Sequence, residues 1–220
     1  MINECIFIVH SFVCAAASLF ALGWGPYALC SLVSFQCILS NILVLKQVTL
    51  FGLVATCADP FTIGATIGFN LMQEFYGRKI ARQSIFVTFF LLIFYTISTH
   101  VRMWYAPASV DTMQGHYQAL FGTTLRIATA SLVTYFIVQW VDYLIYGFLK
   151  VWFNKRRMLL RALITIVICQ AIDTLLFTFL GLGSIVIHPW HVVLVSYAIK
   201  LIAAVFGIMF IKICSHFFCF

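Results

Sequence analysis

The chain has 220 residues, of which 64% are hydrophobic and only 9% are charged. Soluble domains carry about 25% charged residues, so this composition excludes a soluble globular protein and indicates an integral membrane protein. A membrane-spanning helix takes roughly 20 residues, which leaves room for about six to eight spans and no separate soluble domain. We therefore expect residues 1–220 to form one all-α domain, a polytopic bundle of transmembrane helices.

The formal net charge of +7 could indicate a nucleic-acid partner, but the basic residues gather in two short segments, 78–82 and 150–161. Basic segments between membrane spans are explained by the positive-inside rule without any ligand. The eight cysteines form no CxxC pair, so neither a disulfide framework nor a zinc site is expected. We expect no metal, no cofactor and no direct contact with nucleic acid.

Apolar runs and turn residues predict seven spans in chain order. Their approximate ranges are 5–22, 27–45, 51–76, 84–104, 124–149, 162–182 and 192–215. A polar loop follows the fourth span, and residues 183–191, with His188 and Trp190, are expected at a membrane interface, where tryptophan is favoured. If the first span is only peripheral, six remain. With both basic segments in the cytoplasm, seven spans place the N-terminus outside and the C-terminus inside.

The third predicted span carries a row of polar side chains. Steps of three or four residues from Gly52 lead through Thr56, Asp59, Thr62, Thr66, Asn70 and Gln73. This spacing is typical of one face of an α-helix. A polar face inside a bilayer must be buried against other helices or a wet cavity. The remaining spans are therefore expected to supply a polar surface for it to face.

Three charged residues lie inside predicted spans at similar depth: Asp59, Asp173 and Lys200. An ionised group at mid-bilayer costs at least ~2.5–3.5 kcal/mol, so such groups usually have partners, and we expect these three to share one site. Other spans add polar candidates for it: Asn41, Ser131, Tyr135, Gln139, Gln170 and Thr174. For each of them, an interhelical hydrogen bond that stabilises the bundle is the alternative.

Four further charged residues are candidates for coupling or for structural roles: Lys46, Glu74, Arg126 and Asp142. The four-residue spacing of Glu74, Arg78 and Arg82 predicts an ion-paired helix end. Asp142 lies nearer the basic segment, and a structural pair with Lys150 or Arg126 is the alternative to a coupling role. The chain has no P-loop and no GxSxG motif, and its histidines lie near span ends, so we do not expect an enzyme.

Several motifs resemble those of the queuosine precursor transporter family, also grouped as vitamin uptake transporters. The most specific is RIATASLVTYFIVQWVD, residues 126–142. The others follow in order: Ser40-Asn41, Leu45-Lys46, the turn at 74–77 with residues 81–82, QAIDTLLF at 170–177 and SYAIK at 196–200. The resemblance covers about residues 36–205. Two positions depart from the pattern, since Asn70 and Ser196 stand where Asp is expected in the family or in related sequences.

This resemblance implies an importer of 7-deazaguanine bases in the bacterial inner membrane, with preQ0, preQ1 or queuine as solute for the queuosine modification of tRNA. The base edge offers N–H donors beside a carbonyl acceptor, which suits Asp or Asn together with Gln or Lys. Our hypothesis is that Asp173 and Gln170 contact this edge, that Asn41 and Gln139 complete the site, and that Lys200 balances the empty-site carboxylate. Asp59 and Asn70 are further candidates for the solute path.

Two alternatives stay open. The solute could be another small polar molecule, a vitamin or a different purine. The chain could instead be a structural or partner-dependent membrane subunit whose polar faces bind another protein. In every case the lipid bilayer is an expected partner.

Overall fold

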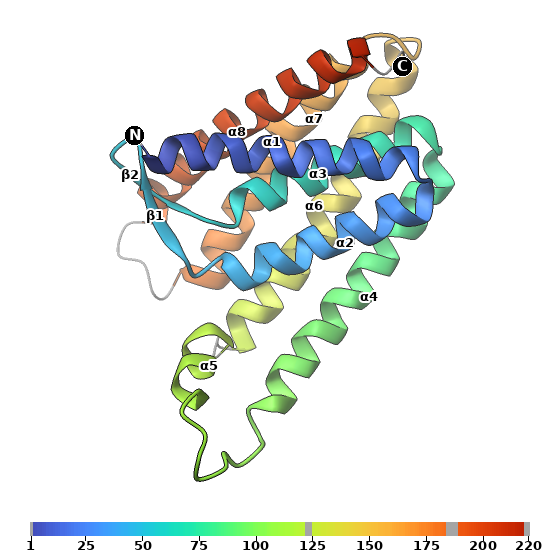
Figure 1. Ribbon diagram of the computed structural model, residues 1–220. Coiled ribbons are helices and arrows are strands. Elements are labelled where there is room, and N and C mark those ends of the chain that lie inside the picture. The colour runs from blue at the N-terminus through green and yellow to red at the C-terminus, as the bar shows by residue number, and fades with distance from the viewer. Residues whose placement is uncertain (1, 122–124, 184–188, 218–220) are drawn as a thin grey trace.

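The computed structural model describes residues 2–121, 125–183 and 189–217, which form a bundle of helices with one small hairpin (Figure 1). The elements in chain order are α1 (Ile2–Gly23), α2 (Pro26–Leu43), β1 (Gln47–Leu50), β2 (Leu53–Thr56), α3 (Asp59–Phe75), α4 (Arg78–Arg102), α5 (Gln114–Phe121), α6 (Leu125–Trp152), α7 (Met158–Phe177), a π-helical turn (Thr178–Leu182) and α8 (Pro189–Phe217). The prediction of an all-α polytopic bundle is confirmed.

Six helices of the described chain are long and apolar enough to cross a membrane: α1, α2, α4, α6, α7 and α8. The first helix is among them and packs against α2, α3 and α8, so it belongs to the bundle. The seventh long helix is α3, which has only 17 residues. Successive long helices run back and forth between the two ends of the bundle (Figure 1).

The predicted third span, residues 51–76, is wrong in its first part. Residues 47–56 form an antiparallel hairpin in which Leu50 lies opposite Leu53. Phe51 and Gly52 both have positive φ, 52° and 78°, as a two-residue turn between twisted strands requires. Pro60 explains why α3 starts only at Asp59: proline interrupts the interior of a helix but is tolerated in its first turn. Thr56 is therefore on a strand, and the polar face of the helix begins at Asp59.

The other differences concern helix ends. Helix α4 begins at Arg78 and α7 at Met158, each several residues earlier than predicted, and the short helix α5 lies in the expected polar loop. In the expected interfacial segment, Trp190 is exposed in the first turn of α8, whereas His188 lies outside the described residues.

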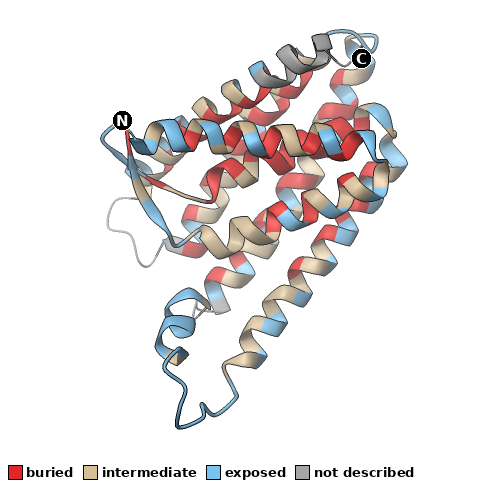
Figure 2. Cartoon of the chain, viewed as in Figure 1, coloured by how far each residue is buried: buried red, intermediate tan, exposed pale blue. Residues whose placement is uncertain are grey.

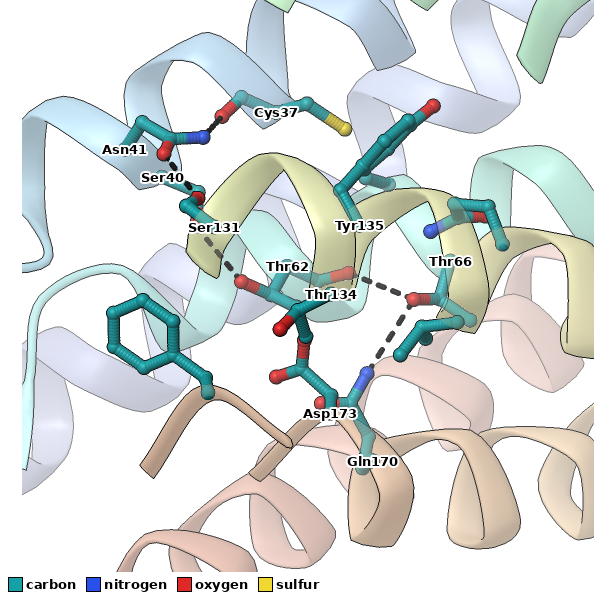
Figure 3. A pocket seen from close by; sticks show the side chains of 14 residues that line it. Cys37, Ser40, Asn41, Thr62, Thr66, Ser131, Thr134, Tyr135, Gln170 and Asp173 are labelled. Carbon is teal, nitrogen blue, oxygen red and sulfur yellow. Dashed lines mark hydrogen bonds between the residues drawn. The ribbon is translucent and has the colours of Figure 1, made fainter. Parts of the chain in front are cut away.

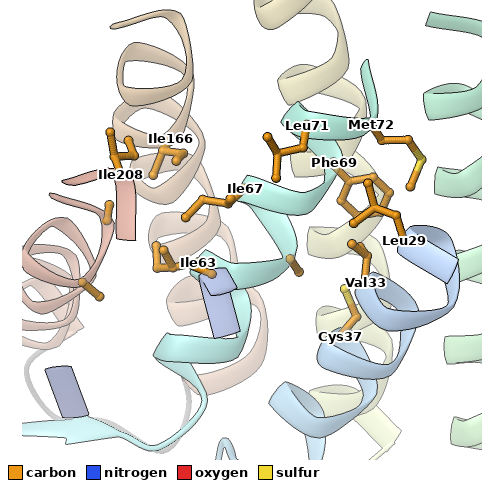
Figure 4. Close-up of a cluster of buried hydrophobic side chains, with 14 of the residues drawn as sticks. Leu29, Val33, Cys37, Ile63, Ile67, Phe69, Leu71, Met72, Ile166 and Ile208 are labelled. Carbon is orange, nitrogen blue, oxygen red and sulfur yellow. The ribbon is translucent and has the colours of Figure 1, made fainter. Parts of the chain in front are cut away.

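Helix α3 occupies the centre of the bundle. It contacts each of the other six long helices, and thirteen of its 17 residues are buried (Figure 2). Its apolar side chains, including Ile63 and Ile67, join a hydrophobic cluster with residues of α2, α7 and α8 (Figure 4). Because protein rather than lipid surrounds α3, it need not be as long as the spans around it.

Two glycines allow α1 and α2 to approach α3 closely. A Cβ on Gly64 would lie 2.7 Å from Cys14 Cβ, and a Cβ on Gly68 would clash with Val33 Cγ2. Small residues four apart are a common device for close helix packing in membranes, where van der Waals contact replaces the hydrophobic effect.

We expect Gly68→Ala to lower the stability of the purified protein in detergent by about 1–3 kcal/mol, since the added methyl group overpacks this interface. Adding Val33→Ala should restore part of the loss by removing the clashing methyl groups. Gly115→Ala is the control, because nothing lies within 4 Å of a Cβ there. Thermal unfolding of the three variants measures this, and wild-type stability of Gly68→Ala would contradict the packing described.

Candidate solute site

Two adjoining cavities lie inside the bundle. The larger, about 610 Å³, is lined by the hairpin and by α2, α3, α4, α5, α6, α7 and α8. The smaller, about 80 Å³, lies between α2, α3, α6 and α7 (Figure 3), and none of its described lining residues belongs to the hairpin. Residues that line both are Ser40, Asn41, Thr62, Ser131, Asp173 and Phe177. We call these spaces the outer cavity and the inner pocket.

The inner pocket is polar on the sides formed by α2 and α6. Ser131 Oγ donates a hydrogen bond to Asn41 Oδ1 at 2.5 Å, and Asn41 Nδ2 donates to the Cys37 carbonyl at 3.0 Å. The hydroxyls of Ser40 and Thr62 lie 2.9 Å apart. These bonds link α2 to α6 and α3, and they fix the orientation of the Asn41 amide.

Two glutamines, Gln139 of α6 and Gln170 of α7, also line the inner pocket. Gln170 Nε2 lies 3.4 Å from Thr66 Oγ1, which itself donates to the Thr62 carbonyl at 2.9 Å. Gln170 Oε1 and Gln139 Oε1 are buried and have no hydrogen-bond partner in the described part of the chain. An unsatisfied buried polar atom costs about 1–3 kcal/mol. Both amides are therefore suited to bind polar groups of a solute.

The three charges expected to share a site all line the outer cavity. Lys200 Nζ lies 2.5 Å from Asp173 Oδ2 and 3.4 Å from Thr174 Oγ1. Asp59 is only 2% exposed, and Thr56 Oγ1 donates to its Oδ1 at 3.3 Å. The structure thus brings together six of the seven predicted solute-binding residues around the two cavities: Asn41, Asp59, Gln139, Gln170, Asp173 and Lys200.

The seventh, Asn70, lines neither cavity. It is buried on α3 beside Asp142 of α6, whose carboxyl also faces the Cys169 thiol. The two side chains interact with each other, but within the described residues neither Asp142 Oδ1 nor the polar atoms of Asn70 make a hydrogen bond of normal length and angle. The structural pair of Asp142 with Lys150 or Arg126 is wrong: Lys150 contacts Glu74, and Arg126 Nε donates to the Leu180 carbonyl near the other end of α6.

Glu74 is the centre of an ion cluster at the end of the bundle opposite the hairpin. Its carboxylate accepts two hydrogen bonds from Arg161, at 3.0 and 3.1 Å, and lies 3.2 Å from Lys150 Nζ. Tyr146 donates to it at 3.0 Å. The Arg161 side chain is completely buried. We call these four residues the Glu74 cluster, and they fasten the end of α3 to α6 and α7.

The predicted ion-paired helix end of Glu74, Arg78 and Arg82 is wrong. Gly77, with φ 87°, separates α3 from α4, so the two arginines are on a different helix. The Arg78 guanidinium instead lies 4.8 Å from the centre of the Tyr143 ring. Lys46, the remaining candidate, is exposed in the turn after α2 and lines neither cavity.

Some residues that line the cavities were not predicted from the sequence. Helix α4 contributes Tyr95, Thr96, Thr99 and His100 to the outer cavity, and Thr134 and Cys37 line the inner pocket. The four-residue spacing of Tyr95 with Thr99, and of Thr96 with His100, was a usable signal of a polar helix face. Cys37 gave no such signal, because its type suits apolar packing equally well.

A polytopic helical bundle with charged and amide side chains around an internal cavity is the arrangement of a membrane solute transporter. A family model described as "Putative vitamin uptake transporter" matches residues 60–214, and the chain belongs to this family. A Bacillus subtilis protein named "Probable queuosine precursor transporter" is 30% identical over 185 residues, which is 83% of this chain and 81% of that protein. No solved structure matches the chain. The prediction of a transporter rather than an enzyme is confirmed by the family.

We expect Glu74→Gln to destabilise the protein by about 3–5 kcal/mol, since it leaves the Arg161 charge buried without a carboxylate. Replacing both partners, in Glu74→Leu with Arg161→Met, should cost less than Glu74→Gln alone because no buried charge is left unpaired. Unfolding in detergent measures the difference, with the exposed Arg156→Gln as the control. A Glu74→Gln protein as stable as wild type would contradict this assignment.

Proposed function

We propose that the protein imports queuosine precursors, 7-deazaguanine bases, across the bacterial cell membrane. The observation that carries the proposal is the convergence of Asn41, Gln139, Gln170 and Asp173 on the inner pocket. The relative named as a queuosine precursor transporter supports this class of solute.

The donor and acceptor pattern of a 7-deazaguanine edge complements the pocket. The carboxylate of Asp173 can accept from two adjacent N–H groups, and a glutamine amide can donate to the ring carbonyl. Tyr135 and Phe177 also line the pocket and offer aromatic surface for a flat ring. In this hypothesis Lys200 neutralises Asp173 while the site is empty.

The volumes of the two cavities indicate that each holds a different part of the solute. The inner pocket, about 80 Å³, is too small for a complete ligand site, while the outer cavity, about 610 Å³, falls within the range of roughly 300–1,000 Å³ seen for small-molecule sites. We therefore place the polar edge of the base in the inner pocket and the rest of the solute in the outer cavity.

We infer the orientation of the bundle in the membrane from its basic residues. Eight of them lie at the end that carries the Glu74 cluster: Arg78, Lys79, Arg82, Lys150, Lys155, Arg156, Arg157 and Arg161. By the positive-inside rule this end faces the cytoplasm, so the hairpin, the N-terminus and the outer cavity face outward and the C-terminus lies inside. The Glu74 cluster then closes the cytoplasmic end, and it must rearrange before the solute can be released.

This orientation predicts that a green fluorescent protein fused after residue 220 is fluorescent and that alkaline phosphatase fused there is inactive. The two reporters fold only on opposite sides of the membrane, so they form a matched pair. The same fusions at the N-terminus should give the reverse pattern. An active alkaline phosphatase at the C-terminus would contradict the orientation.

The function is tested in a bacterium that can neither make nor import 7-deazaguanines. Expression of the chain with an added precursor should restore queuosine in tRNA. Asp173→Asn should reduce uptake about 10- to 100-fold, since a hydrogen bond to a charged group contributes about 1.5–3 kcal/mol. Asp111→Asn, on the exposed loop after α4, is the control and should be neutral. No queuosine with any precursor would refute the function, and full uptake by a normally expressed Asp173→Asn protein would refute the site.

A vitamin is the second candidate, favoured by the description of the family model, and another purine is a further alternative. Competition of unlabelled vitamins and bases against a labelled precursor separates these candidates.

The purified chain in liposomes addresses the remaining possibility, a partner-dependent subunit, because uptake by the chain alone excludes that role. Imposing a pH gradient on the same liposomes tests whether Asp59, Glu74 or Asp142 couples transport to protons.

A further inference from the structure

The charged groups around the outer cavity are out of balance. Among the described residues that line it there are two carboxylates, Asp59 and Asp173, and one ammonium group, Lys200. Lys200 is 2.5 Å from Asp173, so its hydrogen-bonded partner is that carboxylate. His100 and His191 also line the cavity, and the His100 ring nitrogen Nδ1 is engaged with the Thr96 carbonyl at 2.8 Å.

Among the side chains of the described residues, Asp59 has one hydrogen-bond partner, Thr56. Thr56 donates to Oδ1 at 3.3 Å, whereas Oδ2 is buried and has no hydrogen-bond partner in the described ranges. With the residue only 2% exposed, bulk water does little to solvate this carboxylate. Lys200 acts on Asp59 only through space, because its hydrogen bond goes to Asp173. A buried carboxylate without a hydrogen-bonded cation is costly, and a cationic solute would supply one.

The position of Asp59 relative to the inner pocket indicates which part of a solute it meets. It precedes Thr62, which lines both spaces, by three residues on α3. At 1.5 Å per residue this is about 4.5 Å along the helix, roughly one turn outward. A short substituent on a base seated in the inner pocket can therefore reach this carboxylate.

We propose that Asp59 binds a protonated amine on the 7-substituent of the solute, so that the protein prefers amine-bearing 7-deazaguanines, such as preQ1, to uncharged ones, such as preQ0. This inference rests on the proposed function and specifies its substrate class. Asp173 and the amides recognise the base edge, which all these bases share, and Asp59 recognises the substituent, in which they differ.

The test compares two solutes of nearly equal size, 7-aminomethyl- and 7-hydroxymethyl-7-deazaguanine, in uptake by liposomes that contain the full-length protein. They share the base edge and differ in the charge of the substituent. The wild type should take up the amine with an apparent affinity at least about tenfold higher, the scale of a charge-assisted hydrogen bond. Asp59→Asn should remove this preference, so that the ratio of amine to hydroxymethyl uptake falls about tenfold whatever the absolute rates of the variant.

Equal uptake of the two bases by the wild type overturns the inference and leaves the proposed function intact, whereas uptake of neither base overturns both. A preference that survives in Asp59→Asn also overturns the role of Asp59. If that variant does not fold, the wild type can be tested with N-acetylated preQ1, in which the amine has lost its charge. It should inhibit wild-type uptake less strongly than preQ1 does, and equally strong inhibition would overturn the inference.

Discussion

Lipid cannot hydrogen-bond to polar side chains, and this constraint explains the arrangement of the bundle around α3. The polar face of α3 carries Asp59, Thr62, Thr66, Asn70 and Gln73, and α3 is in contact with each of the other six long helices. At the outer end this face borders two cavities; at the other end α3 is fastened by the Glu74 cluster. A short helix is sufficient here, because its surroundings are protein and not lipid.

The two ends of the polar face of α3 differ in whether the charged and polar groups around them have partners. The Glu74 carboxylate is paired with two cations and a tyrosine hydroxyl, and these contacts fasten α3 to α6 and α7. Around the two cavities, three buried oxygens have no hydrogen-bond partner among the described residues: Asp59 Oδ2, Gln139 Oε1 and Gln170 Oε1. Such atoms are costly in a membrane, which favours a role in binding solute over a purely structural role.

Composition, helix periodicity and the positions of charged residues were enough to predict the class of fold and to identify most of the charged and amide side chains that line the two cavities. Asp59, Asp173 and Lys200 could be grouped because charges inside a bilayer need partners. The hairpin at 47–56 was missed because its residues are as apolar as a span, although Pro60 limited how far α3 could extend. The partners of Glu74 and Asp142 depend on how α3, α6 and α7 meet, and spacing along one helix contains no information on contacts between helices.

In the site that we propose, a base binds between α2, α3, α6 and α7 with its polar edge in the inner pocket. The most direct measurement is a structure of the protein with a 7-deazaguanine base bound. We expect density for the ring between Tyr135 and Phe177, with its polar edge within hydrogen-bond distance of Asp173 and Gln170. A base bound elsewhere, with Asp173 still paired to Lys200 and the inner pocket empty, would contradict it.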